Sequence, residues 1–176
     1  MKISMWKALS YVCAAAVLTT MAVAAKDVRT ISVRDECDPA TFNEAVGPGT
    51  CIGDGDVTFA EFLAEVPNGG HPDWRFNNSV TDADVAVNAN NRGGEAHTFT
   101  KVAKFGGGFI DVLNTEAPIP ECAVTLPGGA LIPAQTALDT IIPPDGQNHL
   151  TTRLDRGTNR FQCCIHPWMR STVTRR

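Results

Sequence analysis

Short stretches of alternating apolar and polar residues are the dominant pattern along this chain. The first, residues 28–34 (VRTISVR), predicts a β-strand, because successive side chains of a strand point to opposite faces. From residue 79 onward the pattern recurs between turns rich in Gly, Asn and Asp. The predicted strands there are two short ones within residues 79–91 about a turn at Asp82–Asp84, then 96–102, 149–153, 159–163 and 170–174. Short strands between regular turns predict an all-β sandwich.

Residues 35–78 break this pattern and are interpreted as an extension with one short helix. Thr58 precedes the apolar run FLAEV and can cap a helix, and Glu61 can reach back to it as in a capping box. The same segment, DGDVTFAEF, invites comparison with a calcium-binding loop. With Glu61 as the last ligand, Thr50 and Ile52 fall where the first two carboxylates should be. The sequence therefore predicts a structural helix cap here and excludes that calcium site.

The first 25 residues have the pattern of a secretory signal peptide. Lys2 and Lys7 precede a largely apolar stretch, residues 8–23, and Ala22-Val23-Ala24 has the small-x-small pattern of a cleavage site. An uncleaved membrane anchor is the alternative, but the apolar stretch is short for a membrane span. We therefore expect an exported protein, periplasmic or secreted, with no membrane attachment after cleavage and with one domain's worth of mature chain.

The charge balance argues against nucleic-acid binding. The chain has 15 basic and 19 acidic side chains and a net charge of −4, which becomes −6 without Lys2 and Lys7. A nucleic-acid-binding protein needs a basic surface. The last 26 residues are the exception at +5, so the rest of the exported chain carries −11. The basic end is either a docking patch or an ordinary solvated end of the molecule.

The stretch FQCCIHPWM, residues 161–169, places a thiol, an imidazole and a thioether close together. Cys163, His166 and Met169 are spaced as Cys-x2-His-x2-Met, which suits one soft metal ion. Copper bound by two His and one Cys with a weak axial Met is the site of blue-copper proteins, and His97 is the candidate for the second His. Strand alternation turns Cys163 inward with Phe161 and turns Cys164 to the other face.

The loop and its flanks add two expectations about the surface. Pro167 fixes the backbone after His166 and should stiffen the loop. Trp168 is expected either to cover one side of the site or to form part of an apolar surface around it. His71 and His149 fit no site and are expected to be ordinary surface residues.

Five cysteines remain after residue 25, which fits one metal thiolate and two disulfides in an oxidising compartment. Cys37 and Cys51 would close a loop of about 15 residues, worth about 3 kcal/mol in the chain-entropy model. By elimination, Cys122 is expected to pair with Cys164.

These motifs resemble those of the cupredoxins, the blue-copper family that includes plastocyanin, azurin and amicyanin. The Cys163-x2-His166-Pro-x-Met169 spacing is most similar to that of amicyanin. Asn90-Asn91-x-Gly-Gly-x-x-His97-Thr-Phe resembles the turn and strand that carry the upstream His. The resemblance covers roughly residues 79–174. It implies a Greek-key β-sandwich and one type 1 copper per chain, with ligands His97, Cys163, His166 and Met169.

Two features depart from the small cupredoxins. The 66-residue separation of His97 and Cys163 is longer, which indicates an insertion within 105–147. Segment 35–78 has no counterpart in their minimal fold. We therefore divide the chain into a signal peptide (1–25), an N-terminal strand with a disulfide-containing extension (26–78), and a copper-binding core (79–176) that forms one domain with that extension.

The leading functional hypothesis is an electron carrier that exchanges electrons with a redox partner protein, as a monomer and without catalysing a reaction. His166 is expected at the surface as the electron exit, in an apolar end of the molecule, with most of the C-terminal arginines at the opposite pole. The alternative hypothesis is copper delivery or storage. A self-contained multicopper oxidase is excluded by counting, since the chain has four His and the mononuclear site uses two of them, which leaves too few for a trinuclear cluster.

Overall fold

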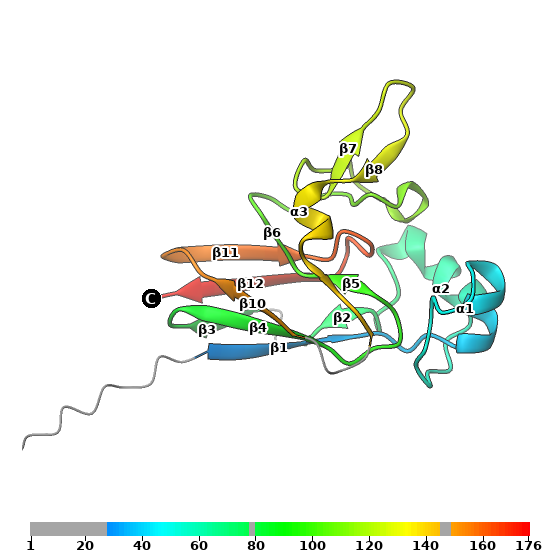
Figure 1. The fold of residues 1–176 in the computed structure, drawn as a ribbon, viewed down its shortest axis with the longest axis horizontal. Helices are drawn as coiled ribbons and strands as arrows, with labels where there is room; N and C mark the ends of the chain where they lie inside the picture. The colour runs from blue at the N-terminus through cyan, green and yellow to red at the C-terminus, as the bar shows by residue number, and fades with distance from the viewer. Residues whose placement is uncertain (1–27, 78–79, 145–148) are drawn as a thin grey trace, which may run out of the picture.

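The computed structural model describes residues 28–77, 80–144 and 149–176, and its main body is two four-stranded β-sheets packed against each other (Figure 1). One sheet has the order β10-β4-β1-β2, with bounds His149–Arg153, Ala86–Asn91, Val28–Arg34 and Arg75–Phe76. The other has the order β3-β12-β11-β6, with bounds Val80–Ala83, Arg170–Arg175, Gly157–Gln162 and Thr100–Val102. The predicted all-β sandwich is confirmed.

The core between the sheets is built from the inward positions of the alternating strands. The apolar residues of this core without exposed area are Ile31, Val33, Val87 and Ala89 from the first sheet and Phe161 and Val173 from the second. Phe99 stacks on Phe161 with ring centroids 4.3 Å apart. Truncating a fully buried Phe of this kind to Ala costs about 3–5 kcal/mol.

The predicted strand 96–102 is divided in two, and this division positions His97. β5 (His97–Thr98) pairs with β9 (Ile141–Ile142), whereas β6 pairs with β11 in the main sheet. Between them, the Phe99 N–H donates to the Thr140 carbonyl at 3.0 Å. His97 is thereby held outside the main sheet, next to the loop that follows β11.

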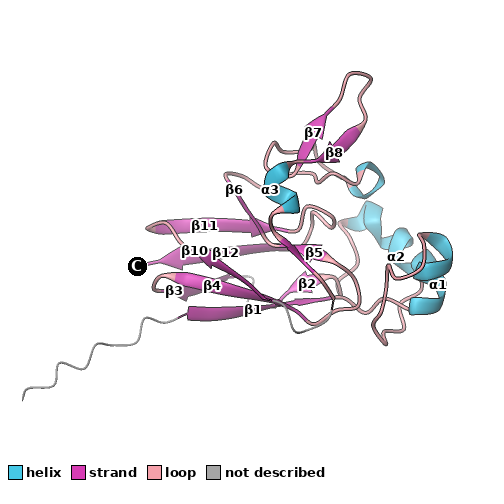
Figure 2. Cartoon of the chain, in the orientation of Figure 1, coloured by secondary structure: helices cyan, strands magenta, loops and turns pink. Residues whose placement is uncertain are grey.

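The extension holds two helices rather than the single one expected. α1 (Pro39–Ala45) precedes α2 (Phe59–Glu65), which continues into the 3-10 turn η1 (Val66–Asn68). The predicted capping box of Thr58 and Glu61 is present at α2. α1 begins at a similar signal that the apolar pattern did not reveal: Asp38 accepts the Thr41 N–H at 2.9 Å, and a proline occupies the first turn. Both helices lie at one end of the sandwich (Figure 2).

Residues 105–144 form a second addition to the sandwich. It contains η2 (Asp111–Leu113), the hairpin β7–β8 (Ala123–Thr125 and Leu131–Pro133) and α3 (Gln135–Leu138). The hairpin projects away from the two sheets (Figure 1). Both predicted disulfides are confirmed: Cys37–Cys51 closes the extension, and Cys122–Cys164 ties the second addition to the end of β11.

The predicted signal peptide lies outside the described residues. Within the described ranges, the helices are all too short or too polar to cross a membrane.

Candidate metal centre

Three donor atoms from two distant parts of the chain meet at one buried point. The Cys163 sulfur lies 3.7 Å from Nδ1 of His97 and 3.8 Å from Nδ1 of His166, and the two Nδ1 atoms are 3.2 Å apart. His97 begins β5, while Cys163 and His166 lie in the loop between β11 and β12. All three residues are buried, and in the described part of the chain they are the group of His, Cys, Asp or Glu donors that could hold a metal ion.

The triangle of donors has the size of a metal site. A point equidistant from the three atoms, in their plane, lies about 2.1 Å from each. Metal–imidazole bonds are about 2.0–2.1 Å and metal–thiolate bonds about 2.3 Å. The three side chains therefore fit a single ion with little adjustment.

Met169 closes the loop beside these donors. Its N–H donates to the His166 carbonyl at 3.0 Å, and its carbonyl accepts the Cys163 N–H at 3.0 Å. Its side chain is buried. These bonds fix the backbone of the loop, and the role of the Met169 sulfur as a fourth ligand stays a prediction.

The surroundings of the Cys163 sulfur favour its deprotonated, thiolate form. Its Sγ lies 3.4 Å from the backbone N–H groups of Thr98 and His166, which both donate to it. Burial by itself raises the pKa of the thiol. Hydrogen bonds and positive charge from His166 and His97 outweigh that effect and hold the pKa well below its ordinary value.

The neighbouring Cys164 is directed away from the centre, as strand alternation predicted. Its sulfur is bound to Cys122, and among the described residues Cys163 is the free cysteine. Gly108 packs against it so closely that an added Cβ would lie 1.9 Å from the Cys164 carbonyl oxygen. The disulfide thus anchors the chain one residue after the Cys163 thiol.

Asp35 is a buried carboxylate that contacts His97 on the side of the ring away from Cys163 and His166. Its Oδ2 lies 2.7 Å from Nε2 of His97, on the side of the ring opposite Nδ1, and its side chain has no exposed area. Backbone N–H groups of Gly94 and Glu95 donate to it at 2.8 and 3.2 Å. Burial raises the pKa of Asp35, but the hydrogen bond and charge of His97, with these N–H groups, lower it overall. Such a partner fixes the orientation of a metal-binding imidazole.

The Gly93-Gly94 pair of the upstream motif has a structural reason. A Cβ on Gly93 would lie 1.8 Å from the Asp35 carboxylate, and one on Gly94 would lie 2.6 Å from the Cys37 sulfur. Only glycine lets this turn approach Asp35 and the Cys37–Cys51 disulfide so closely.

Glu95 is the corresponding carboxylate near His166. Its Oε2 accepts a hydrogen bond from the indole N–H of Trp74 at 2.6 Å and lies 3.6 Å from Nε2 of His166. Burial raises its pKa, against the opposing effects of the His166 charge and the Trp74 bond. Sequence reasoning missed both Asp35 and Glu95. The one local signal was that Glu95 lies within the GGEAH stretch that carries His97.

The expectation that His166 lies at the surface is wrong. Only 2% of the residue is exposed, because the extension covers it. The ring centroid of Phe62 on α2 lies 5.8 Å from that of His166, edge to face, and the Trp74 ring lies 6.4 Å away. Trp168 packs beneath the same segment, where a Cβ on Gly70 would lie 2.0 Å from the indole. Of its two predicted roles, Trp168 therefore contributes to the cover.

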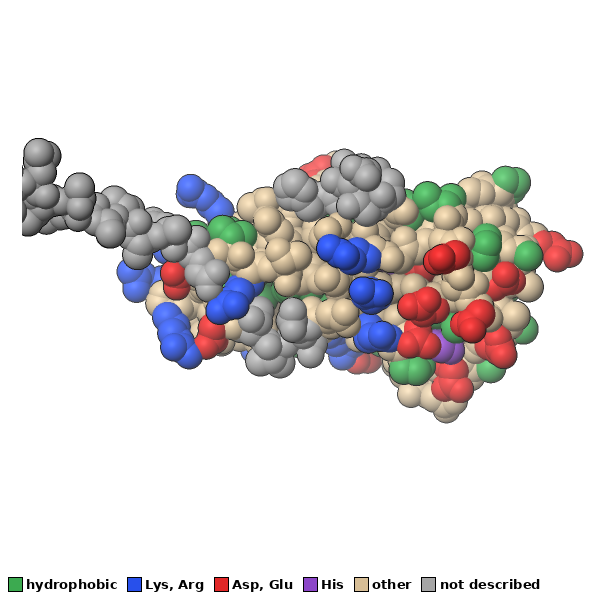
Figure 3. All heavy atoms as spheres, turned by 90° about the horizontal axis from the view of Figure 1, so that it is seen from below, with side chains coloured by type: hydrophobic (Ala, Val, Ile, Leu, Met, Phe, Trp, Pro, Cys, Tyr) green, Lys and Arg blue, Asp and Glu red, His purple; other side chains and the backbone are tan. Residues whose placement is uncertain are grey.

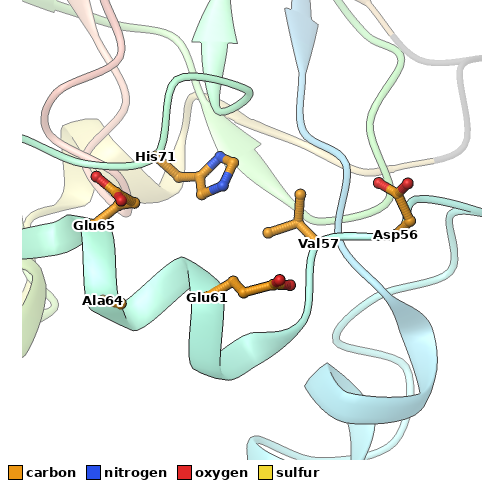
Figure 4. A pocket seen from close by; sticks show the side chains of 6 residues that line it. All are labelled: Asp56, Val57, Glu61, Ala64, Glu65 and His71. Carbon is orange, nitrogen blue, oxygen red and sulfur yellow. The ribbon is translucent and has the colours of Figure 1, made fainter.

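A hollow in the extension, separate from the three donors, has polar walls, but its polar groups do not converge on one point (Figure 4). Asp56, Glu61, Glu65 and His71 line it, and Figure 4 shows their polar groups spread along it. Glu61 is engaged by the Thr58 cap at 2.7 and 2.9 Å. His71 differs from its prediction as a surface residue: its side chain is 14% exposed and its ring meets Trp74 edge to face. The side chain of His149 lies outside what the structure describes.

Comparison with known proteins yields structural likenesses only. No family model and no curated protein match the sequence. A purple cupredoxin from Nitrosopumilus maritimus matches with 14% identity and a TM-score of 0.37, over 84% of this chain and 99% of that one. Oxidised plastocyanin from Dryopteris crassirhizoma matches with 16% identity and a TM-score of 0.38, over the same shares. Amicyanin from Paracoccus versutus matches with 16% identity and a TM-score of 0.29, over 58% of this chain and 73% of that one.

Proposed function

We propose that this chain is an exported, monomeric electron carrier that binds one copper ion through His97, Cys163, His166 and Met169. The observation that carries the proposal is the buried triangle of two imidazole nitrogens and one sulfur. Copper in such a set of ligands takes up and releases one electron as Cu(II) and Cu(I). The protein's part is to hold the donors fixed, to exclude water and to set the local charge.

The donor types favour copper over zinc. Two imidazoles and one thiolate suit either ion, but structural zinc sites complete a tetrahedron with a fourth His, Cys or carboxylate. The candidate for a fourth ligand here is the buried Met169, and a weak axial thioether is typical of blue-copper sites. The carboxylates of Asp35 and Glu95 face the distal nitrogens of the two imidazoles, so they serve as their supports and leave the inner coordination positions to other donors.

Rigidity favours electron transfer over delivery. Two N–H bonds hold the Cys163 sulfur, the Cys122–Cys164 disulfide anchors the next residue, and Asp35 holds His97. Ligands that move little between the two oxidation states lower the reorganisation barrier. A delivery protein instead has to open its site to a recipient, and here the extension covers His166.

Among the described side chains, the one histidine outside the centre, His71, gives a catalytic role no support. His71 accepts the Asp73 N–H at 3.3 Å and packs on Trp74, in a hollow separate from the centre. We therefore propose a carrier rather than an oxidase or reductase.

Voltammetry of the copper-loaded protein, combined with copper transfer to a Cu(I) chelator, distinguishes the two functions. A carrier should show a reversible one-electron wave and keep its metal over many cycles. Rapid loss of copper to the chelator with sluggish electron exchange would instead support delivery.

A further inference from the structure

The segment that covers the metal centre is acidic throughout. Residues 35–73 contain nine Asp and Glu residues and no Lys or Arg. Asp35 is buried and paired with His97, whereas the exposed carboxylates of the segment include Glu44, Asp54, Asp56 and Glu61. Within the described ranges, Asp73 is the one carboxylate of this segment that forms an ion pair with a Lys or Arg, namely Arg75. On the face drawn in Figure 3, acidic side chains gather over the helical end of the molecule, and Lys and Arg lie over the middle and the opposite end.

An apolar hollow at the same end reaches the metal-binding His166. It has a volume of about 310 Å³, and its walls include Phe42, Val46, Phe59, Leu63, Val112 and, beside His166, Glu95. Three of these apolar side chains are well exposed: Val46 by 59%, Leu63 by 40% and Val112 by 77%. Glu44 and Asp111 are close in sequence to the lining residues Val46 and Val112 but do not line the hollow themselves. The hollow is thus an apolar surface whose lining carboxylate is Glu95, at the acidic end of the molecule.

We propose that this end of the molecule is the docking surface for a positively charged electron-transfer protein, one that presents an apolar side chain among lysines or arginines. The inference rests on the proposed function. Charge complementarity is its basis: the acidic segment attracts such a partner, and the apolar hollow, which His166 helps to line, gives a contact without water. Of the C-terminal arginines, Arg170 is the exception, because it lies beside the metal loop and binds the Pro167 carbonyl and Glu116. Arg156, Arg175 and Arg176 lie at the ends of β11 and β12 opposite that loop and contribute little at physiological salt, where charges are screened within about 8 Å.

Two small one-electron oxidants of opposite charge test this surface without knowledge of the natural partner. Tris(phenanthroline)cobalt(III) is cationic with apolar faces, and ferricyanide is anionic. In each reaction one electron passes from the reduced, copper-loaded protein to the probe, cobalt(III) becoming cobalt(II) or ferricyanide becoming ferrocyanide, and no bond forms or breaks.

The matched variants are Glu44→Lys at the docking end and Asp155→Lys at the far end. Both replace an exposed carboxylate and change the net charge equally; Asp155 lies in the turn between β10 and β11 and pairs with Lys101. We expect Glu44→Lys to slow the cobalt reaction about fivefold and to speed the ferricyanide reaction, and Asp155→Lys to change either rate by less than about twofold. Equal effects of the two variants would overturn the docking surface.

A second measurement does not depend on electron transfer. The redox-inert tris(phenanthroline)chromium(III) broadens the NMR signals of nearby amides in the protein with no metal added. Broadening centred on α1, α2 and η2 is expected; broadening centred on the β7–β8 hairpin or the far end would overturn the inference.

Salt-sensitive self-association that Arg156→Glu abolishes would identify a second copy of this chain as the occupant and would also overturn the inference. A protein that binds no copper yet shows the expected broadening would refute the proposed function alone.

Discussion

The carboxylate of Asp35 lies 2.7 Å from Nε2 of His97, and neither side chain has any exposed area. The two residues are 62 positions apart in the sequence. β1 ends at Arg34, so Asp35 is placed by the first strand of the sandwich, and His97 by the short strand β5. Because Nε2 faces Asp35, Nδ1 is the nitrogen directed at Cys163 and His166. The charge of Asp35 would also lie one imidazole ring from an ion held at this centre.

Removing that charge should raise the reduction potential of the copper-loaded protein. Asp35→Asn keeps a side-chain oxygen that can accept from His97 but removes a negative charge that favours Cu(II) over Cu(I). We expect a rise on the order of 100 mV, from a unit charge about 7 Å away at an effective dielectric constant of about 20. Voltammetry measures it. Asp38→Asn, at the partly exposed cap of α1, is the control and should leave the potential close to that of the parent. An unchanged potential in Asp35→Asn would mean that Asp35 has no electrostatic role.

The Gly93-Gly94 turn should be required for copper affinity. A methyl group on Gly93 would overlap the Asp35 carboxylate and displace it from His97. We expect Gly93→Ala to weaken copper binding about 10–100-fold, the usual effect of disturbing the support of a metal-binding His. Competition with a chelator measures the affinity. The control is Gly128→Ala, where a positive φ also disfavours alanine but nothing lies within 4 Å. This variant should lose stability and keep its affinity; equal affinities in the two variants would contradict the prediction.

The extension should slow the loss of metal. Phe62→Ala removes the ring that meets His166 and opens the cover over the centre. We expect copper to pass to a chelator at least about ten times faster, together with a loss of about 3–5 kcal/mol in the free energy of unfolding. Phe59→Ala is the matched control, because Phe59 stacks on Phe62 and meets Phe42 edge to face, whereas the ring that meets His166 is that of Phe62. If both variants release copper at the parent rate, the extension does not protect the centre.

The metal-free protein should lose stability between about pH 8.5 and 10. Burial lowers the pKa of His97, but its hydrogen bonds with Asp35 and Cys163 outweigh this and raise the pKa to about 10. A raised His pKa gives stability that is complete below the ordinary value near 6.5 and is lost as the pH rises through about 10. The lowered pKa of Cys163 acts in the opposite direction up to the ordinary thiol value of about 8.5, so the net fall lies above that value. Denaturant unfolding across this range measures it. In His97→Gln the free energy of unfolding should decrease less steeply with pH over this range. An equally steep decrease in that variant would exclude His97 as the source of the pH dependence.

Local patterns in the sequence were sufficient for most strands of the two main sheets, the three converging donors and both disulfides, but not for β2 or for the strands of the second addition. Alternation fixed the face of Phe161 and Cys163, and that choice left Cys164 for Cys122. These inferences depend on neighbours within a strand or a loop, or on counting.

The support and the cover of the centre depend on contacts between distant segments. No local sequence pattern predicts that Asp35 is the partner of His97. Likewise, the position of Phe62 on a seven-residue helix does not predict that its ring covers His166. The exposure of His166 was therefore predicted wrongly: the extension has its own aromatic cluster of Phe42, Phe62 and Trp74, and this cluster gains burial by packing on the metal loop.

The most direct test of the account is the visible absorption spectrum of the protein after one equivalent of Cu(II), beside that of Cys163→Ser. A short copper–thiolate bond in a His-His-Cys site gives intense absorption toward the red end of the visible range. We predict that band in the parent protein, at one copper per chain, and its complete loss in Cys163→Ser. A parent protein with only the weak absorption of ordinary Cu(II), or with a band that survives the loss of Cys163, would contradict the assignment of this centre.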